Sequence, residues 1–218
     1  MTADMTRSRT HGIGLPPFQP GMRIGLYGGS FNPAHEGHRH VALTALRRLQ
    51  LDRIWCLVTP GNPLKDIRDL PKLETRITRT AAMMDHPRID VTGVEAKAGT
   101  SYTAMTLKWL QQRTRGVDLV WIMGADNLIQ FHHWQQWRSI MASMPVAIVD
   151  RPGYSRAPLK ATAAKAFAHA RIQDNRARAL VGAPCPVWTF LYGPRSHLSS
   201  TALRRHSQQQ SLSQKQQP

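Results

Sequence analysis

The sequence has few cysteines and no long apolar run. Cys56 and Cys185 lie far apart in a chain of 218 residues, which disfavours a disulfide framework or a cysteine-based metal site. We therefore expect two structural thiols and a cytoplasmic protein. No apolar run approaches the ~20 residues that a membrane-spanning helix needs. Residues 1–20 lack the apolar segment of a secretory signal and are rich in proline, so we expect a disordered leader and no membrane partner.

Acidic residues are also scarce, with 13 Asp and Glu against 29 Lys and Arg, which gives a formal net charge of +16. A field of this sign attracts polyanions, including nucleotides and nucleic acids. The basic residues have no interleaved aromatic side chains and form no nucleic-acid-binding motif, so we expect no specific nucleic-acid partner. A non-catalytic, basic nucleic-acid-binding protein remains the alternative from a different functional class.

Short apolar runs alternate with segments of helical periodicity along the chain. The runs predict strands near residues 24–27, 54–59, 89–94, 119–123, 146–149 and 187–191. Strands that alternate with helices predict an α/β fold with a parallel sheet, whose ligands bind at the carboxyl ends of the strands. Residues 155–181, rich in Ala and Arg, predict a peripheral, mobile helix. Residues 205–218 predict a disordered polar tail.

The most informative motif is Gly-Gly-Ser-Phe-Asn-Pro-Ala-His-Glu-Gly-His at residues 28–38, after the first expected strand. Its glycines allow a sharp turn and a close approach to a ligand, and the helix that follows offers N–H groups to an anion. His35 and His38 fall on one side of the first helical turn, where imidazoles can donate to phosphate oxygens. A zinc site would need a third ligand, and Glu36 lies in the wrong register to supply it, so we expect no metal site.

A second motif, Ser199-Ser200-Thr201 followed by Arg204, comes after the last expected strand. Hydroxyl groups at a helix start can cap the helix, and they can also bind phosphate together with an arginine one turn later. Taken alone, a cap beside a solvated arginine explains the pattern well. Taken with the glycine–histidine motif, it predicts the other side of a phosphate clamp.

These two motifs and four further segments, in this order, resemble the nucleotidyltransferase superfamily with the (H/T)-x-G-H signature. Over residues 22–204 the pattern is similar to the bacterial nicotinate-nucleotide adenylyltransferases, although Asn32 stands where many members carry Asp. The resemblance implies a Rossmann-like open parallel sheet with helices on both faces, in a nucleotidyltransferase domain over residues 21–204. The further segments are Asn62-Pro63-Leu64-Lys65, the Ser-Tyr-Thr segment at 101–107, the Gly-x-Asp segment with its Phe and Trp at 124–134, and Arg151-Pro152-Gly153-Tyr154.

The activity that the resemblance implies is adenylyl transfer from ATP to nicotinate mononucleotide. The products would be nicotinate adenine dinucleotide (deamido-NAD) and pyrophosphate, a step of NAD biosynthesis, and Mg²⁺ would be carried with ATP. The attacking phosphate is already anionic at neutral pH, so the reaction needs positioning and charge neutralisation rather than a general base. The expected partners are ATP and nicotinate mononucleotide, and the sequence leaves a homo-oligomer open.

By the same resemblance, His35 and His38 are the catalytic residues. Trp134 would stack on the pyridine ring and Asp126 would accept from a ribose hydroxyl, although Trp134 can equally be a core residue and Asp126 a helix cap. The expected ATP-binding residues are Gly28, Gly29, Ser30, Phe31, His35, His38, Ser199, Ser200, Thr201 and Arg204. The expected acceptor-binding residues are Lys65, Tyr102, Thr103, Asp126, Trp134 and Arg151.

Other acceptors define the alternatives within the superfamily. Pantetheine-phosphate adenylyltransferases carry Thr in place of the first histidine and Lys in place of the final arginine, so His35 and Arg204 argue against that activity. Class I aminoacyl-tRNA synthetases need a Lys-Met-Ser-Lys-Ser-like loop, which this sequence does not contain. Nicotinamide mononucleotide stays open as an acceptor.

Overall fold

A single parallel sheet organises the part of the chain that the computed structural model describes, namely residues 9–10, 12–61, 70–100, 102–150 and 158–192. Eight strands in these residues pair in the order β1-β4-β3-β2-β5-β6-β8-β7, and every pair is parallel. Their bounds are β1 Arg9–Thr10, β2 Arg23–Gly29, β3 Arg53–Val58, β4 Ile89–Thr92, β5 Asp118–Gly124, β6 Val146–Val149, β7 Arg171–Ile172 and β8 Trp188–Leu191.

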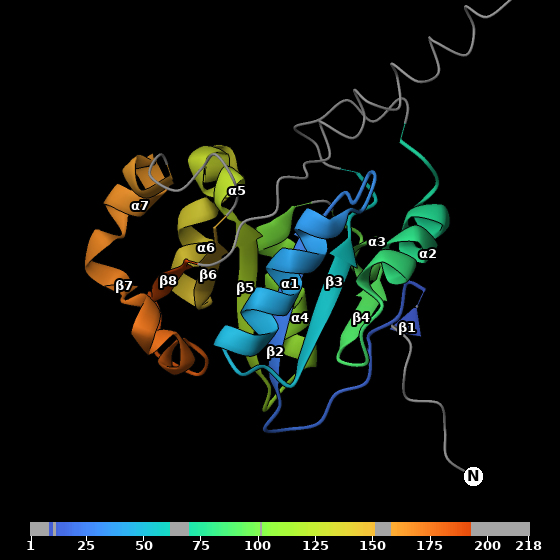
Figure 1. Cartoon of the computed structure of the whole chain (residues 1–218), viewed down its shortest axis with the longest axis horizontal. Coiled ribbons are helices and arrows are strands. Elements are labelled where there is room, and N and C mark those ends of the chain that lie inside the picture. The colour runs from blue at the N-terminus through green and yellow to red at the C-terminus, as the bar shows by residue number, and fades with distance from the viewer. Residues whose placement is uncertain (1–8, 11, 62–69, 101, 151–157, 193–218) are drawn as a thin grey trace, which may run out of the picture.

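Helices cover both faces of this sheet, with α1 in front of it and α4 behind it in Figure 1. Within the described residues, no helix is long and apolar enough to cross a membrane. The α-helices are α1 Glu36–Arg48, α2 Leu73–Met84, α3 Val94–Ala98, α4 Thr103–Arg113, α5 Ala125–Gln130, α6 Trp137–Ser143 and α7 Thr162–Ala166. The 3-10 helices are η1 Phe131–His133, η2 Pro158–Lys160, η3 Ala168–Ala170 and η4 Asp174–Leu180.

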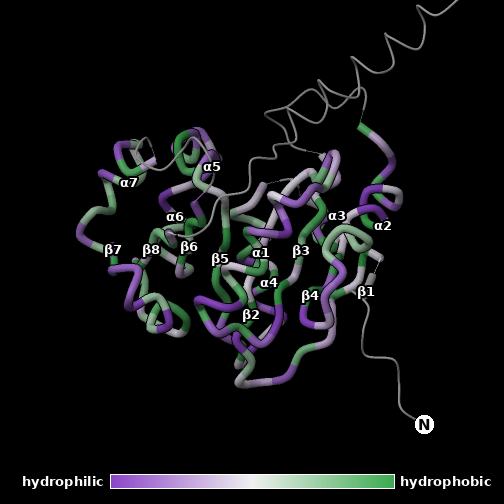
Figure 2. The backbone as a smooth tube through the Cα atoms, in the orientation of Figure 1, coloured by the Kyte–Doolittle hydropathy of each residue, from purple (hydrophilic) through white to green (hydrophobic). Residues whose placement is uncertain are grey.

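Two hydrophobic cores result from the alternation of side chains along the strands. Leu26 and Trp55 face α4, α5 and α6 in one core, whereas their neighbours Tyr27 and Cys56 face α1 and α2 in the other. Figure 2 shows hydrophobic residues along the central strands and hydrophilic residues on the outer turns of the helices. The structure therefore confirms the predicted Rossmann-like α/β fold, an open parallel sheet with helices on both faces.

The strand order reverses between β2 and β5. From β2 the chain adds β3 and β4 on one side, and then it returns to add β5, β6 and β8 on the other side. The two strands at this reversal end at Gly29 and Gly124. In open α/β sheets, ligands bind in the crevice outside the carboxyl ends of strands at such a reversal. The fold thus places the glycine–histidine motif where a nucleotide is expected.

Within the disordered leader expected over residues 1–20, the described residues 9–10 and 12–20 are held against the sheet. Strand β1 pairs with β4, and the Gly93 amide donates to the Gly12 carbonyl at 2.7 Å. Phe18 packs edge-on against Trp55, with the ring centroids 6.0 Å apart. The prolines of this segment suggested disorder. An extended segment can nevertheless be held in place when its backbone pairs with an edge strand and a few of its apolar side chains pack against the core.

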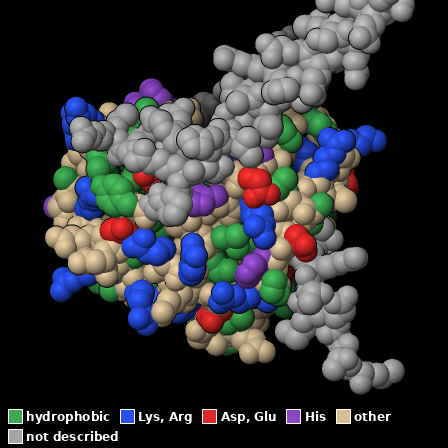
Figure 3. All heavy atoms as spheres, viewed as in Figure 1, with side chains coloured by type: hydrophobic (Ala, Val, Ile, Leu, Met, Phe, Trp, Pro, Cys, Tyr) green, Lys and Arg blue, Asp and Glu red, His purple; other side chains and the backbone are tan. Residues whose placement is uncertain are grey.

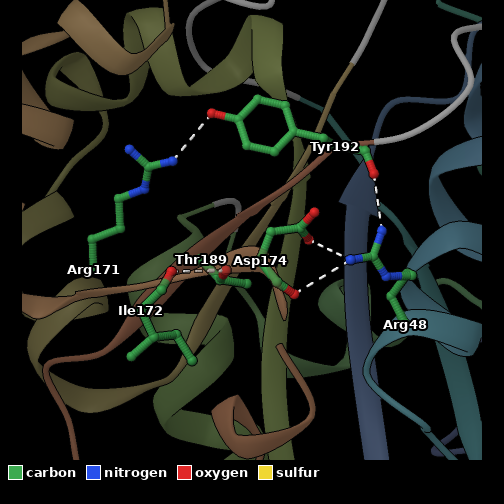
Figure 4. Close-up of polar contacts among 6 residues, drawn as sticks. All are labelled: Arg48, Arg171, Ile172, Asp174, Thr189 and Tyr192. Atoms are coloured by element: carbon green, nitrogen blue, oxygen red, sulfur yellow. Dashed lines mark hydrogen bonds and ion pairs between the residues drawn. The ribbon is translucent and has the colours of Figure 1, made fainter. Parts of the chain in front are cut away.

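The segment at 158–180 also departs from prediction, because it is a chain of short pieces rather than one peripheral helix. Alanines of α7 are buried in one hydrophobic core, and an alanine of η4 is buried in the other. The segment therefore passes from one face of the sheet to the other around the edge beside β8. A straight helix cannot follow this path. Figure 4 shows how it is anchored. Arg48, at the end of α1, contacts the Asp174 carboxylate at 2.6 Å and donates to the Tyr192 carbonyl at 3.0 Å. Arg171 donates to the Tyr192 hydroxyl at 3.2 Å.

Candidate active site

Two histidines form a reciprocal cap at the start of α1, directly after β2. His35 is the N-cap residue, and its Nδ1 accepts from the Gly37 amide at 3.0 Å. His38 closes the cap in the other direction, because its Nδ1 accepts from the His35 amide at 3.3 Å. The ring centroids are 3.9 Å apart, and His35 is only 2% exposed. The predicted arrangement of both imidazoles on one side of the helix start is therefore present.

This cap fixes the chemistry of the imidazoles as well as their positions. A neutral imidazole whose Nδ1 accepts a hydrogen bond carries its proton on Nε2. Both rings therefore use Nδ1 for the backbone and keep Nε2 as the donor nitrogen. A pair of imidazoles held together by the fold, beside the positive end of the α1 dipole, can stabilise negative charge on phosphate oxygens.

The glycines before the histidines have a different role from the one expected. Gly28 and Gly29 belong to β2, and neither has a positive φ. A methyl group at Gly28 would overlap the Trp121 indole, so glycine is needed there for packing against β5. The sharp turn occurs later, at Phe31, whose φ is +45°. The prediction of a glycine turn is therefore wrong in position, because the close neighbour at Gly28 is a side chain of the protein itself.

The ring of Phe31 stabilises this turn from the inside. It is buried and packs edge-on against Tyr27, with the centroids 5.5 Å apart, and against His38 at 5.0 Å. One side of the His38 ring is thereby held by an aromatic neighbour. Side-chain packing and backbone capping together restrict the rotamers of the histidine pair.

The described residues that were predicted to bind the acceptor lie directly after β5 and at the start of α4. Asp126 occupies the first turn of α5 directly after β5, and Tyr102 is the exposed N-cap residue of α4, followed by Thr103. The half-buried Trp134 packs edge-on against Phe131, with the centroids 5.2 Å apart. The helix cap before α5 is Gly124, so the reading of Asp126 as an N-cap does not hold.

Two buried charged residues at this edge of the sheet escaped the sequence analysis. Arg76 in α2 is 2% exposed, and its guanidinium contacts the loops after β2 and β3. Glu95 in α3 is 4% exposed and hydrogen-bonds to Thr59 and Thr106, and burial raises its pKa to about 7. The sequence pattern could have predicted the burial of Arg76, because this residue lies on the apolar face of its helix, three residues after Leu73.

Several predicted site residues lie outside the described part of the chain. They belong to the loop after β3, the loop after β6 and the segment after β8. These residues are Lys65, Arg151, Ser199, Ser200, Thr201 and Arg204. Their predicted roles remain predictions.

The described residues form neither a metal-ligating cluster nor a disulfide. Among the described residues, no group of three or more His, Cys, Asp or Glu side chains is arranged to hold a metal ion. Cys56 and Cys185 are both free thiols. Figure 3 shows Lys and Arg side chains spread over the visible face, with Asp and Glu between them, rather than gathered into one stripe.

Sequence comparison places the chain among known proteins. Residues 26–206 match the family model described as cytidylyltransferase-like. A probable nicotinate-nucleotide adenylyltransferase from Methylorubrum extorquens is 59% identical over 183 residues, which cover 84% of this chain and 99% of the relative. Another from Rhizobium meliloti is 54% identical, with 84% of this chain and 97% of the relative covered.

Structural comparison finds the same fold at much lower sequence identity. The nicotinic acid mononucleotide adenylyltransferase of Plasmodium falciparum, complexed with NaAD, has a TM-score of 0.63 at 16% identity and covers 84% of this chain and 83% of its own. A second structure of that enzyme, complexed with APC, has a TM-score of 0.61 with the same coverage. The matched family model and the two bacterial relatives show that this chain belongs to the cytidylyltransferase-like family, in its nicotinate-nucleotide adenylyltransferase branch.

Proposed function

We propose that this chain transfers the adenylyl group of ATP to nicotinate mononucleotide. A phosphate oxygen of the mononucleotide attacks the α-phosphorus, the bond from that phosphorus to the bridging oxygen of pyrophosphate breaks, and deamido-NAD and pyrophosphate leave. The observation that carries this proposal is the reciprocally capped pair His35 and His38 at the reversal of strand order. The family membership established above supports the reaction class.

The histidine pair acts on charge rather than on a proton. The nucleophile is an anion, so nothing has to be deprotonated, and negative charge is redistributed over the oxygens of the transferring phosphoryl group. Donors that are already held in place stabilise this charge without reorganising during the reaction. His35 and His38 meet this requirement because their Nδ1 atoms are engaged by the backbone and their rings are packed.

The two substrates would occupy opposite sides of this pair. ATP, as its Mg²⁺ complex, would lie against Gly28, Gly29, Ser30 and Phe31, with its terminal phosphates toward the segment Ser199, Ser200, Thr201 and Arg204. The mononucleotide would lie toward the α4 and α5 starts. There Tyr102 and Thr103 would orient the ring, Asp126 would accept from the ribose, and Trp134 would stack on the pyridine, with Lys65 and Arg151 near its phosphate.

The magnesium ion enters this scheme as part of the substrate. Mg²⁺ binds phosphate oxygens and keeps several waters, so it would arrive on the triphosphate of ATP. Two free thiols support a reducing, cytoplasmic setting. We expect no specific nucleic-acid partner, because the basic residues form no nucleic-acid-binding motif.

An acceptor panel tests the proposal. The purified chain is incubated with ATP and Mg²⁺ and, in parallel, with nicotinate mononucleotide, nicotinamide mononucleotide, pantetheine phosphate or no acceptor, while pyrophosphate release is followed. We expect the acid to be used best. Equal or better use of the amide would overturn the assigned acceptor, and release with pantetheine phosphate alone would assign the chain to the rival activity.

A further inference from the structure

Arg76 joins three separate segments at the carboxyl edge of the sheet. Its Nη1 donates to the Ser30 carbonyl at 3.0 Å and to the Thr59 carbonyl at 2.7 Å. Its Nη2 donates to the Pro60 carbonyl at 3.1 Å, and its Nε donates to the Pro71 carbonyl at 2.9 Å. Four of the five N–H groups of one buried guanidinium are therefore used on backbone carbonyls.

The contact with Ser30 bears directly on the ATP side of the site. The Ser30–Phe31 peptide is not among the cis bonds, so its carbonyl and its N–H point in opposite directions. Because the carbonyl faces Arg76, the Phe31 amide is directed away from the guanidinium. Phe31 itself has a φ of +45°, which a residue with a Cβ adopts only when its surroundings hold it there. Arg76 is one of the groups that hold this turn.

The contacts with Thr59 and Pro60 bear on the start of the loop that follows β3. The Thr59 amide donates to the Gly29 carbonyl at 3.1 Å, which extends the pairing of β2 and β3 beyond the sheet. The Thr59 side chain bonds to the Gly61 carbonyl at 3.0 Å and to Glu95. Through Arg76 and Thr59, the loops after β2 and β3 thus share one buried polar network.

The guanidinium is suited to this task in a way that other side chains are not. Its donors lie in one rigid plane, so carbonyls on separate loops are fixed in distance and in direction. A lysine supplies three donors around a single nitrogen and cannot reach the same four acceptors in a plane. Burial lowers the pKa of Arg76, yet an arginine in a protein stays protonated, and the carbonyl dipoles compensate its charge.

We propose that Arg76 is a positioning residue for adenylyl transfer, which holds the turn at Ser30–Phe31 in register with Thr59 and Pro60, where the loop after β3 begins. This inference rests on the proposed function, because it assigns the first loop to ATP and the second to the side where the acceptor phosphate enters. The reaction requires the α-phosphorus and the attacking oxygen to meet in line, so a shift of one loop against the other lowers the rate without removing either binding surface.

The test is the Arg76→Lys variant, with Arg53→Lys as the matched control. Arg53 is also partly buried and bonds to Asp90 and to the Pro87 carbonyl, but it lies at the amino end of β3, at the opposite edge of the sheet. Steady-state kcat and KM for both substrates are measured at a temperature where circular dichroism and urea unfolding show each protein to be fully folded. Under these conditions, a residue with a purely structural role leaves the kinetics of the folded enzyme unchanged.

We expect Arg76→Lys to lower kcat/KM about 100-fold for ATP and for the mononucleotide alike, with a fall in kcat itself. Arg53→Lys should stay within about twofold of the wild type, since its contacts lie far from both loops. Wild-type kinetics in the folded Arg76→Lys variant would overturn the inference while leaving the proposed function intact. A wild-type enzyme that makes no dinucleotide would instead overturn the proposed function.

A second variant covers the case in which Arg76→Lys does not fold. Arg76→Gln keeps two N–H donors without a buried charge, and it is measured in the same way. The same 100-fold loss in kcat/KM supports the inference. Failure of both variants to fold would contradict it, because Arg76 would then be required for the fold itself.

Discussion

Each histidine of the active site uses its two nitrogens for different purposes. Nδ1 accepts a backbone amide and so completes the cap of α1, and the proposed contact with phosphate is assigned to Nε2. The sequence spacing predicted the pairing of the rings. It did not predict the cap, since histidine is not among the residues preferred at an N-cap. The two side chains that we propose for catalysis therefore also cap the helix.

Trp134 is a residue whose role a single substitution can decide. Its ring packs edge-on against Phe131 and Trp121, and its side chain is only half-buried. If the exposed part stacks on the pyridine ring, Trp134→Ala should raise the KM for nicotinate mononucleotide about tenfold and that for ATP much less. Trp134→Phe should recover most of this affinity. Equal changes in both KM values would assign Trp134 to the core alone.

Glu95 makes stability depend on pH in a definite direction. In the unfolded chain a glutamate loses its proton near pH 4.5, but burial keeps the Glu95 proton in the folded protein to about pH 7. Between these values the folded state binds more protons, so the free energy of unfolding falls as pH rises, by about 3 kcal/mol in total. Above pH 7 this contribution is flat.

The measurement is urea unfolding of the wild type and of Glu95→Gln from pH 4 to 8. The difference between the two free energies removes the titrations that both proteins share. We expect the free energy of unfolding of the wild type to fall relative to that of Glu95→Gln as the pH rises from 4.5 to 7, because burial disfavours the charged form of Glu95. A difference that is independent of pH would show that Glu95 titrates normally.

Among the elements, α1 links the histidine pair to the end of β8. Its first turn carries the histidine pair, and Arg48 near its last turn holds both Asp174 and the Tyr192 carbonyl, where β8 has just ended (Figure 4). The chain continues from Tyr192 toward the predicted phosphate-binding segment at 199–204. The same helix therefore anchors the motif at one end and the approach to the second motif at the other.

Removal of this anchor should expose the segment at 158–180. We expect Arg48→Ala to raise the rate of tryptic cleavage within it about tenfold, because a partly buried ion pair and two carbonyl contacts are lost and local opening becomes easier. Arg47→Ala is the matched control, since Arg47 is the exposed neighbour on the same turn. Equal cleavage of the two variants would show that the core alanines alone hold the segment.

For the whole molecule, the sequence predicted the central strands and the helices between them better than it predicted the segments that pack at the edges of the sheet. Apolar runs identified the central strands, because residues buried on both faces leave a continuous hydrophobic signal. The regions at 12–20 and 158–180 were misjudged, since their order depends on contacts with distant partners such as Trp55 and Tyr192. Local propensity carries no information about such contacts.

The site was predictable where its residues are neighbours in the sequence, and less predictable where residues distant in the sequence come together in the fold. The glycine–histidine motif is contiguous, and its position at the end of β2 followed from the strand before it. Arg76 reaches the same edge from a helix more than forty residues later, and only its place on an apolar helix face indicated burial. Gly28 was assigned to the ligand because no local sequence pattern indicates that the Trp121 indole lies against it.

The most direct test of the account measures deamido-NAD formation by His38→Ala and His38→Asn. Asparagine retains an acceptor for the His35 amide but lacks the Nε2 donor, so it separates capping from catalysis. We predict that both variants lose at least about 100-fold in kcat, that His38→Asn unfolds like the wild type, and that a His86→Ala control is fully active. Formation of the dinucleotide at the wild-type rate by either variant of His38 would contradict the account.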